Sequence, residues 1–209
     1  MNIFYLSDQV VECAQWHVDD HVIKMMTEYA QLLSTAHRVC DGTLVSIDRS
    51  HIGKRAKKLL ILDGETILPD DINNPTEDGY TLVGKKCCIN THQNHPSAVW
   101  ARMNDKNYQW LYSLLEALRN EWRNRYGHSK MHKYEQLYSE FLSKPPKNIP
   151  KAEAKSPMLL AMDPKYQISS DPIECYRHFY VTGKAHLAKW KNRNAPWWYS
   201  LPNQEVPGT

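Results

Sequence analysis

Residues 13–38 read CAQWHVDDHVIKMMTEYAQLLSTAHR, and the spacing of this stretch predicts an α-helix. Apolar residues recur every three or four positions and fall in one broad sector, as the helical repeat requires. These apolar residues are Val18, Val22, Met26, Tyr29, Leu33 and Ala36. The pattern predicts one long helix over about residues 9–40, ending before Asp41 and Gly42.

A row of polar side chains follows the same predicted helix on another side. The row consists of His17, His21, Lys24, Glu28, Gln31 and Thr35. Their intervals of four, three, four, three and four residues place them on one narrow line. Such a row is either a solvated face or a network between helices, or it is catalytic. In the catalytic alternative, an amine and a carboxylate one turn apart adjust each other's protonation.

Composition limits the class of protein. The 209 residues, 42% of them hydrophobic, suffice for one domain with a core. No apolar run approaches the roughly 18 residues of a membrane span, and MNIFYLSDQ lacks the features of a signal peptide. Five cysteines without a CxxC pair favour a reduced compartment. We therefore expect a cytoplasmic monomer with no membrane partner. A net charge of +3 neither requires nor excludes nucleic acid.

Residues 43–91 differ in character from the helical stretches. KKLLILDGETIL contains two β-prone runs around Asp63 and Gly64, which is a strong hairpin signal. YTLVGKKCCI can supply another strand. The segment is predicted to be a β-hairpin insertion, and its basic residues are Lys54, Arg55, Lys57, Lys58, Lys85 and Lys86.

Helical periodicity returns after the insertion. Pro96 suits the first position of a helix whose spacing continues until Gly127. Further helices are predicted over about 130–143 and about 171–191, and a Pro- and Lys-rich surface linker is predicted at about 144–157. The predicted fold is mainly α: a single compact helical domain over residues 1–209 with a small β-hairpin insertion.

Four histidines raise the question of a metal. His17 and His21 stand at i and i+4, and His92 and His95 follow later. No HExxH or other closed motif accompanies them. The alternative is that these imidazoles form hydrogen bonds or contact phosphates. We expect no metal and no cofactor.

Two further stretches suit nucleic acid. WKNRNAPWWY at residues 190–199 interleaves aromatic rings with cations, as in sites that stack bases and hold phosphates. Its candidate DNA contacts are Lys191, Arg193, Trp197, Trp198 and Tyr199. The alternative is an aromatic anchor that docks onto the core. Asn94 and His95 open a helix, where free N–H groups suit a phosphate, although plain capping is as common. Arg102 is a further candidate phosphate contact.

Taken together, these stretches resemble the pyrimidine-dimer DNA glycosylases with AP-lyase activity, the T-even phage endonuclease V type. DDHVIKMMTE, ending at Glu28, looks like that family's DQHLMAEYRE, with the Asp, His and final Glu in register. PWWY, starting at Pro196, looks like the family's PTWY in its DNA-contacting tail. A wider set of uncharacterised phage and bacterial relatives is similar in the order of its motifs. These matching residues are Asp19, Lys24, Glu28, Gln31, Asn94, His95, Pro96 and Trp100.

The resemblance implies an enzyme that acts on double-stranded DNA. It assigns the catalytic carboxylate to Glu28. The family's nucleophile is the α-amino group of a Thr exposed by Met removal; here that amine belongs to Met1, or to Asn2 after processing. The amine must be neutral to attack. An α-amino group has an ordinary pKa of about 8 and a lysine one of about 10.4, so Lys24 is the second choice.

Supporting roles complete the prediction. His21 and Lys24 are expected to support Glu28, and the predicted DNA contacts outside the tail are His17, Gln31, Asn94, His95 and Arg102. The alternatives are a phage transferase that modifies a hypermodified thymine, a metal-dependent hydrolase, and a non-catalytic DNA-binding module. A phage origin would place the protein in the cytoplasm of a bacterial host.

Overall fold

The computed structural model describes residues 1–71, 75–129 and 131–200. It is mainly helical, with 46% of residues in helices and 9% in strands, as predicted. The helices are α1 Val10–Trp16, α2 Asp19–Asp41, α3 Pro96–Met103, α4 Asp105–Tyr126, α5 Lys133–Leu142 and α6 Pro172–Gly183. The strands are β1 Thr43–Ile47, β2 Lys57–Ile61, β3 Thr66–Pro69 and β4 Tyr80–Val83. Short 3₁₀ turns lie at η1 Ser50–Ile52, η2 Pro164–Tyr166 and η3 Ala185–Leu187.

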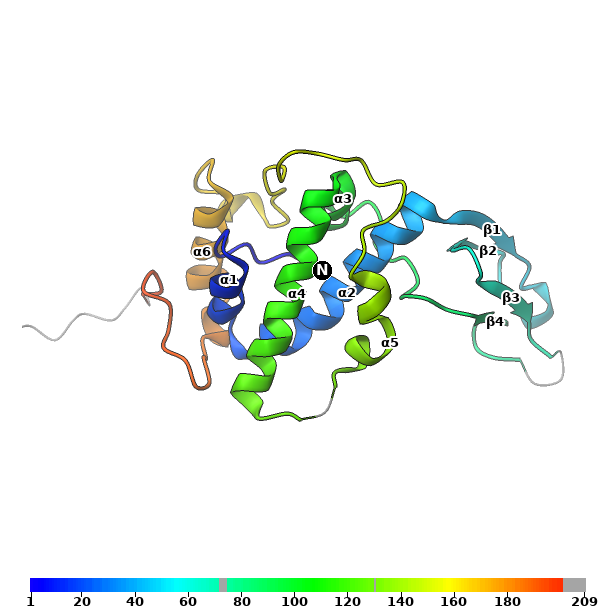
Figure 1. Cartoon of the computed structure of the whole chain (residues 1–209), viewed down its shortest axis with the longest axis horizontal. Helices are drawn as coiled ribbons and strands as arrows, with labels where there is room; N and C mark the ends of the chain where they lie inside the picture. The colour runs from blue at the N-terminus through cyan, green and yellow to red at the C-terminus, as the bar shows by residue number, and fades with distance from the viewer. Residues whose placement is uncertain (72–74, 130, 201–209) are drawn as a thin grey trace, which may run out of the picture.

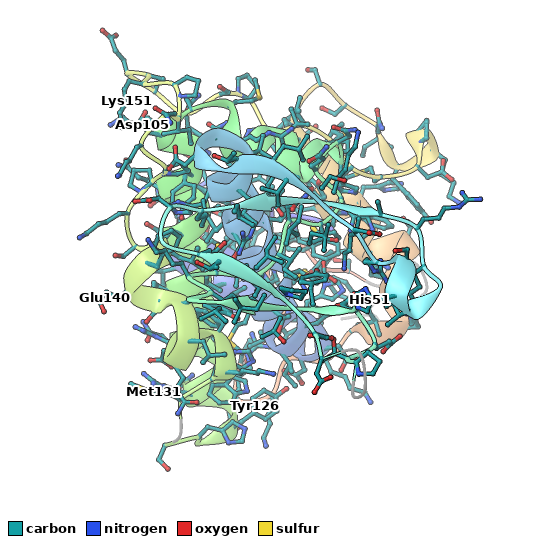
Figure 2. The ribbon with its side chains drawn as sticks, turned by 90° about the vertical axis from the view of Figure 1, so that its right-hand side faces the viewer. His51, Asp105, Tyr126, Met131, Glu140 and Lys151 are labelled. Atoms are coloured by element: carbon teal, nitrogen blue, oxygen red, sulfur yellow. The ribbon has the colours of Figure 1, made fainter. Side chains whose placement is uncertain are left out.

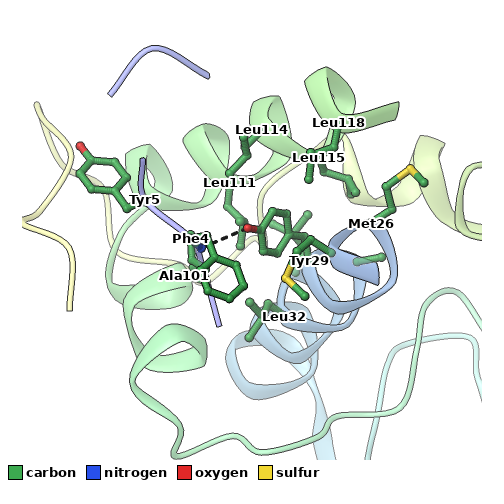
Figure 3. Packing of buried hydrophobic residues seen from close by; sticks show 14 of the residues in the cluster. Phe4, Tyr5, Met26, Tyr29, Leu32, Ala101, Leu111, Leu114, Leu115 and Leu118 are labelled. Carbon is green, nitrogen blue, oxygen red and sulfur yellow. Dashed lines mark hydrogen bonds between the residues drawn. The ribbon is translucent and has the colours of Figure 1, made fainter. Parts of the chain in front are cut away.

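Helix α2 lies at the centre of the helical body. It packs against α3, α4 and α5, while α1 and α6 lie at the opposite end from the strands (Figure 1). The predicted apolar sector of this stretch is buried throughout. Figure 3 shows Tyr29 of α2 facing Leu111, Leu114 and Leu115 of α4, and its hydroxyl accepts a hydrogen bond from the Phe4 backbone N–H at 3.2 Å. The N-terminal segment is thereby fixed in the core.

The single helix predicted over about residues 9–40 is wrong, because the chain breaks at His17 and Val18. Both residues have extended backbone angles. The His17 Nδ1 bonds the Cys13 carbonyl oxygen at 2.7 Å and so closes the end of α1. The Asp19 N–H donates to the Lys189 carbonyl oxygen at 2.9 Å instead of continuing a helix. Periodicity persists across this break, so spacing alone does not reveal it.

Two other predicted helical stretches differ from the structure: one has an internal break, and the other ends early. The run from Pro96 to Gly127 is divided at Asn104, whose side chain accepts from the Asn107 N–H and caps α4. Gly127 ends α4 with φ 64°, as predicted. The last helix ends at Gly183 and not near residue 191, because the chain there turns back to reach the start of α2.

The strands form an arm beside the helical body (Figures 1 and 2). The predicted pairing across Asp63 and Gly64 is wrong: β2 pairs with β1, and β3 pairs with β4, each antiparallel. Glu65 explains this. Its carboxylate accepts hydrogen bonds from the backbone N–H groups of Leu62 and Lys86 and so fixes the chain between the two sheets.

The base of the arm is held by a buried ion pair. Arg38 of α2 contacts Glu65 at 2.8 Å, and both side chains are fully buried. The same guanidinium donates to the carbonyl oxygens of Leu60, Cys87 and Cys88. The predicted linker around 144–157 has no regular element and is fixed along α3 and α4, for example through the Ser156 carbonyl, which accepts from Trp100 Nε1. Among the described residues, no helix is long and apolar enough to cross a bilayer.

Candidate active site

Three nitrogen atoms converge on the carboxylate of Glu28. The α-amino nitrogen of Met1 lies 3.8 Å from its Oε2, and the backbone N–H of Asn2 donates to the same oxygen at 3.3 Å. The Lys24 Nζ, one turn earlier on α2, lies 3.3 Å from Oε1. The Glu28 side chain is 15% exposed, so it is accessible without being open to bulk solvent.

The chain start reaches Glu28 because the residues around it are anchored. Ile3 and Leu6 are fully buried. The Asn2 side chain donates to the Ala161 carbonyl at 3.0 Å and accepts from the Tyr176 hydroxyl at 2.8 Å. Packing and hydrogen bonds of the neighbouring residues therefore place the amine, and its ion pair with Glu28 also holds it there.

Beside Glu28 the surface forms a pocket of about 260 Å³. Its walls come from the chain start, α2, the segment before α6, and the end of α6. The lining residues are Met1, Asn2, Phe4, His21, Lys24, Met25, Glu28, Ala161, Phe179 and Lys184. The predicted catalytic residues Met1, Asn2, His21, Lys24 and Glu28 thus share one pocket.

His21 is neutral in this pocket. Its Nδ1 lies 2.6 Å from the Tyr180 hydroxyl, and its ring stacks on Phe4 with centroids 4.1 Å apart. Burial, followed by the charges of His17 and Lys184, lowers the pKa of His21 to about 3. Loss of hydration disfavours the charged imidazolium.

The pocket carries more positive than negative groups. Glu28 is the one carboxylate that lines it among the described residues, against the Met1 amine, Lys24 and Lys184. Lys184 is half-buried, and its Nζ lies 5.2 Å from the centroid of the Phe179 ring. Within the described part of the chain, Lys184 forms no ion pair. The pocket therefore suits an anionic ligand or one flanked by phosphates.

The remaining members of the polar row lie apart from the pocket. His17 is fully buried, bonds Cys13 and Tyr29, and has its pKa lowered to about 4 by burial. Gln31 is half-buried one turn beyond Glu28. The Thr35 hydroxyl exchanges hydrogen bonds with the backbone of Thr91. His17 and Thr35 therefore form the network between elements that is one alternative for the row.

His95 lies close to the chain start, whereas Arg102 does not. His95 caps α3 by accepting from the Ser97 N–H. Its pKa is lowered first by burial and then by the charge of the terminal amine. Asn94 is exposed beside it. Arg102 is half-buried near Cys40, so it lies roughly 18 Å along α2 from Glu28.

The C-terminal aromatic segment packs onto the helical body. Trp198 meets Trp16 and Tyr180 edge-on, with centroids 5.7 and 6.3 Å apart, and Tyr199 packs on Trp190. Trp197 is 79% exposed. These contacts agree with the alternative of an aromatic anchor for Trp198 and Tyr199, whereas Trp197 is available to a ligand.

Both cations of this segment have partners: Arg193 forms an ion pair, and the Lys191 Nζ lies over an aromatic ring. The Arg193 guanidinium binds both oxygens of Glu121, at 3.0 and 2.9 Å. Glu121 also binds the fully buried Arg125, which in turn contacts Asp19. The Lys191 backbone N–H donates to Asp19, and its Nζ lies over the Tyr126 ring. Their first role in the structure is thus to hold the segment on α2 and α4.

No group of three or more His, Cys, Asp or Glu side chains is arranged to hold a metal ion within the described residues. His17 and His21 have ring centroids 6.5 Å apart, and each already has a hydrogen-bond partner. The absence of a bound metal stays a prediction.

Sequence reasoning missed the contribution of α6. Tyr176, Tyr180 and Lys184 follow one another at intervals of four, which puts them on one side of a helix and its end. That spacing was a usable signal. Nothing in the sequence indicated that this side faces Asn2 and His21.

Comparison of this chain with protein-family models, curated proteins and solved structures gives no match.

Proposed function

We propose that this protein is a DNA glycosylase with AP-lyase activity that removes a damaged pyrimidine from double-stranded DNA. The observation that carries the proposal is the amino-terminal nitrogen beside the Glu28 carboxylate in a pocket of about 260 Å³. An amine and a carboxylate are the two groups that imine-forming base excision requires. The resemblance of residues 19–28 to the endonuclease V type supports the same reaction.

The reaction divides between these two groups. As the bond between the base and C1′ breaks, positive charge develops on the sugar, and Glu28 stabilises it. The amine forms a bond to C1′, and the base leaves with the bonding electrons and takes up a proton from water. The sugar ring then opens as a proton passes from the amine nitrogen to O4′, which gives the imine. The imine makes the C2′ hydrogen acidic; its loss as a proton to water expels the 3′ phosphate, and hydrolysis of the imine releases the enzyme.

The proposal holds for either first residue. The Met1 nitrogen lies 3.8 Å and the Asn2 nitrogen 3.3 Å from the same Glu28 oxygen. Removal of Met1 would therefore leave a terminal amine at the carboxylate. Lys24 is the third amine. Its side chain is 68% exposed, and its Nζ stands on a flexible four-carbon stem, so it is held in place less firmly than the terminal amine.

Pocket size favours excision over transfer. The volume of about 260 Å³ lies below the roughly 300–1,000 Å³ of typical small-molecule sites. That space suits one flipped base and its sugar. A base-modifying transferase would need room for a second substrate beside the base, so it remains the second candidate.

Borohydride trapping tests the proposal. Wild-type protein is incubated with duplexes that contain either a pyrimidine dimer or a ready-made abasic site, and the imine is reduced to a stable adduct. We expect adducts on both. Glu28→Gln should lose base release but still be trapped on the abasic duplex, because its amine is intact. The exposed Glu153→Gln serves as the matched control. No adduct from the wild type on either duplex would contradict the proposal.

A further inference from the structure

We infer that Tyr180 is a positioning residue that holds His21 as the neutral tautomer with its proton on Nε2, so that this N–H donates a hydrogen bond into the pocket. The tautomer is inferred from the contacts of His21 and from the surroundings of Tyr180, without reference to the reaction. What the N–H acts on rests on the proposed function.

The orientation of the imidazole is fixed by its packing. One face of His21 stacks on Phe4 at an interplanar angle of 15°. Tyr180 of α6 meets the ring from another side, at 5.4 Å between centroids and 62°. The 2.6 Å contact to the Tyr180 oxygen occupies Nδ1. Nε2 has no hydrogen-bond partner among the described residues, and His21 lines the pocket.

The direction of the proton follows from the surroundings of Tyr180. This phenol is fully buried, and burial, together with the nearby Cys13, raises its pKa well above 10, so it keeps its proton. Its oxygen also interacts with the Val18 backbone N–H. A phenol has one proton to donate, and His21 Nδ1 is the acceptor that the described residues offer it. The ring proton of His21 must then lie on Nε2.

A second proton on His21 is disfavoured from every side. His17 faces it from the end of α1, Lys24 from α2, and Lys184 and His186 from the segment that ends α6. These groups are cationic or can become so. Glu28, across the pocket, already has three nitrogen partners. The imidazole is thus a donor whose state stays constant across the physiological pH range.

In the proposed reaction this donor would serve an oxygen of the sugar. Ring opening places charge on O4′, and a neutral N–H in the same pocket as Glu28 can stabilise that oxygen without a charge that would repel the forming cation. Loss of the correct tautomer should lower the rate between about 10-fold and 10⁴-fold, the range found for displaced histidine partners in other enzymes.

Nitrogen NMR on the full chain labelled at histidine tests the inference directly. His21 is assigned from the resonance missing in His21→Gln. We expect its Nδ1 to show the shift of an unprotonated acceptor and its Nε2 that of a protonated nitrogen, unchanged between pH 8 and pH 5. A wild-type His21 with the proton on Nδ1, or one that becomes cationic near pH 6.5, would overturn the inference.

Tyr180→Phe supplies the second arm. Its His21 should show a mixture of tautomers, and trapping on the abasic duplex should slow. Tyr176→Phe removes a buried hydroxyl one turn earlier and should leave the His21 spectrum unchanged. An unchanged His21 spectrum in Tyr180→Phe would overturn the inference. A correct spectrum in a protein that forms no imine would refute the proposed function alone.

Discussion

At the scale of single residues, Glu28 derives its setting from distant parts of the chain. Its own helix supplies Lys24, the chain start supplies two nitrogens, and the end of α6 supplies Lys184. The spacing of the polar row was enough to predict that Lys24 and Glu28 meet. It could not separate His21, which lines the pocket, from His17, which lies outside it, because both obey the same periodicity.

Lys184 gives a prediction at this scale. It is a half-buried cation without an ion pair in the described structure, and under the proposed function we expect it to bind a DNA phosphate. Lys184→Gln should weaken duplex binding and make the slope of log K against log salt less negative by about 0.9. Lys165→Gln, which removes an exposed cation paired with Asp163, is the matched control. An identical salt dependence in wild type and Lys184→Gln would exclude the phosphate contact.

At the scale of elements, hydrophobic periodicity located helices but not their breaks or partners. The interruptions at His17 and Asn104 depend on side chains that bond to local backbone, and such bonds leave the apolar spacing intact. Strand pairing in the arm failed for a related reason. The Asp63-Gly64 turn is present, but Glu65 binds Arg38 from a distant helix and redirects the next strand. Sequence near the turn carries no sign of that partner.

The Arg38–Glu65 pair predicts the stability of the arm's attachment. Glu65→Gln should lower the free energy of unfolding by about 3–5 kcal/mol, because it leaves a buried guanidinium without its charge partner. Asp78→Asn breaks the exposed pair with Lys57 in the same arm and should cost less than about 1 kcal/mol. Urea unfolding measures both. Equal losses for the two variants would show that the buried pair does not anchor the arm.

Two tryptophans of the aromatic segment are expected to differ in role, one in DNA binding and the other in stability. Trp197→Ala should weaken DNA binding by roughly 1–3 kcal/mol, the value of one lost base stack. Its ring is 79% exposed and contacts the Arg177 guanidinium at 5.5 Å, so the unfolding free energy should change by less than about 1 kcal/mol. Trp198→Ala removes contacts with Trp16 and Tyr180 and should destabilise the protein. Duplex titrations and urea unfolding on both variants check this. Normal DNA affinity in Trp197→Ala would remove the segment from the interface.

At the scale of the whole molecule, three buried imidazoles couple folding to pH. Burial lowers the pKa of His21 to about 3 and those of His17 and His37 to about 4. In the unfolded chain each imidazole has a pKa of about 6.5. Between these values the unfolded state binds more protons, so stability must fall as the pH drops below about 6.5. The pKa of the Glu65 carboxylate is also lowered in the fold. The stability that such carboxylates contribute is lost only when the pH falls below about 4.3.

The predicted loss between pH 7 and pH 5 is about 2 kcal/mol for each imidazole. Urea unfolding at the two pH values measures the total. His37→Gln, outside the candidate site, should remove one imidazole's share of the pH dependence and leave the rest. A stability that is flat between pH 7 and pH 5 would show that these histidines are not held neutral in the fold.

The mainly helical class and the small β content were predictable from the sequence because periodicity and turn residues report on local structure. The pairing of the chain start with Glu28 was predictable only through the resemblance of residues 19–28 to a glycosylase family. The walls formed by Ala161, Phe179 and Lys184 were not, because contacts between distant segments leave no local pattern.

The central claim is that the chain's first nitrogen, and not a lysine, forms the bond to the sugar. The measurement is peptide mapping by mass spectrometry of the borohydride-reduced adduct on an abasic duplex, with Lys24→Ala mapped in parallel. We predict the sugar remnant on the α-nitrogen of Met1, or of Asn2 if Met1 is removed, and an undiminished adduct in Lys24→Ala. A remnant on Lys24 or Lys184, or an adduct that persists when extra residues precede Met1, would contradict the account.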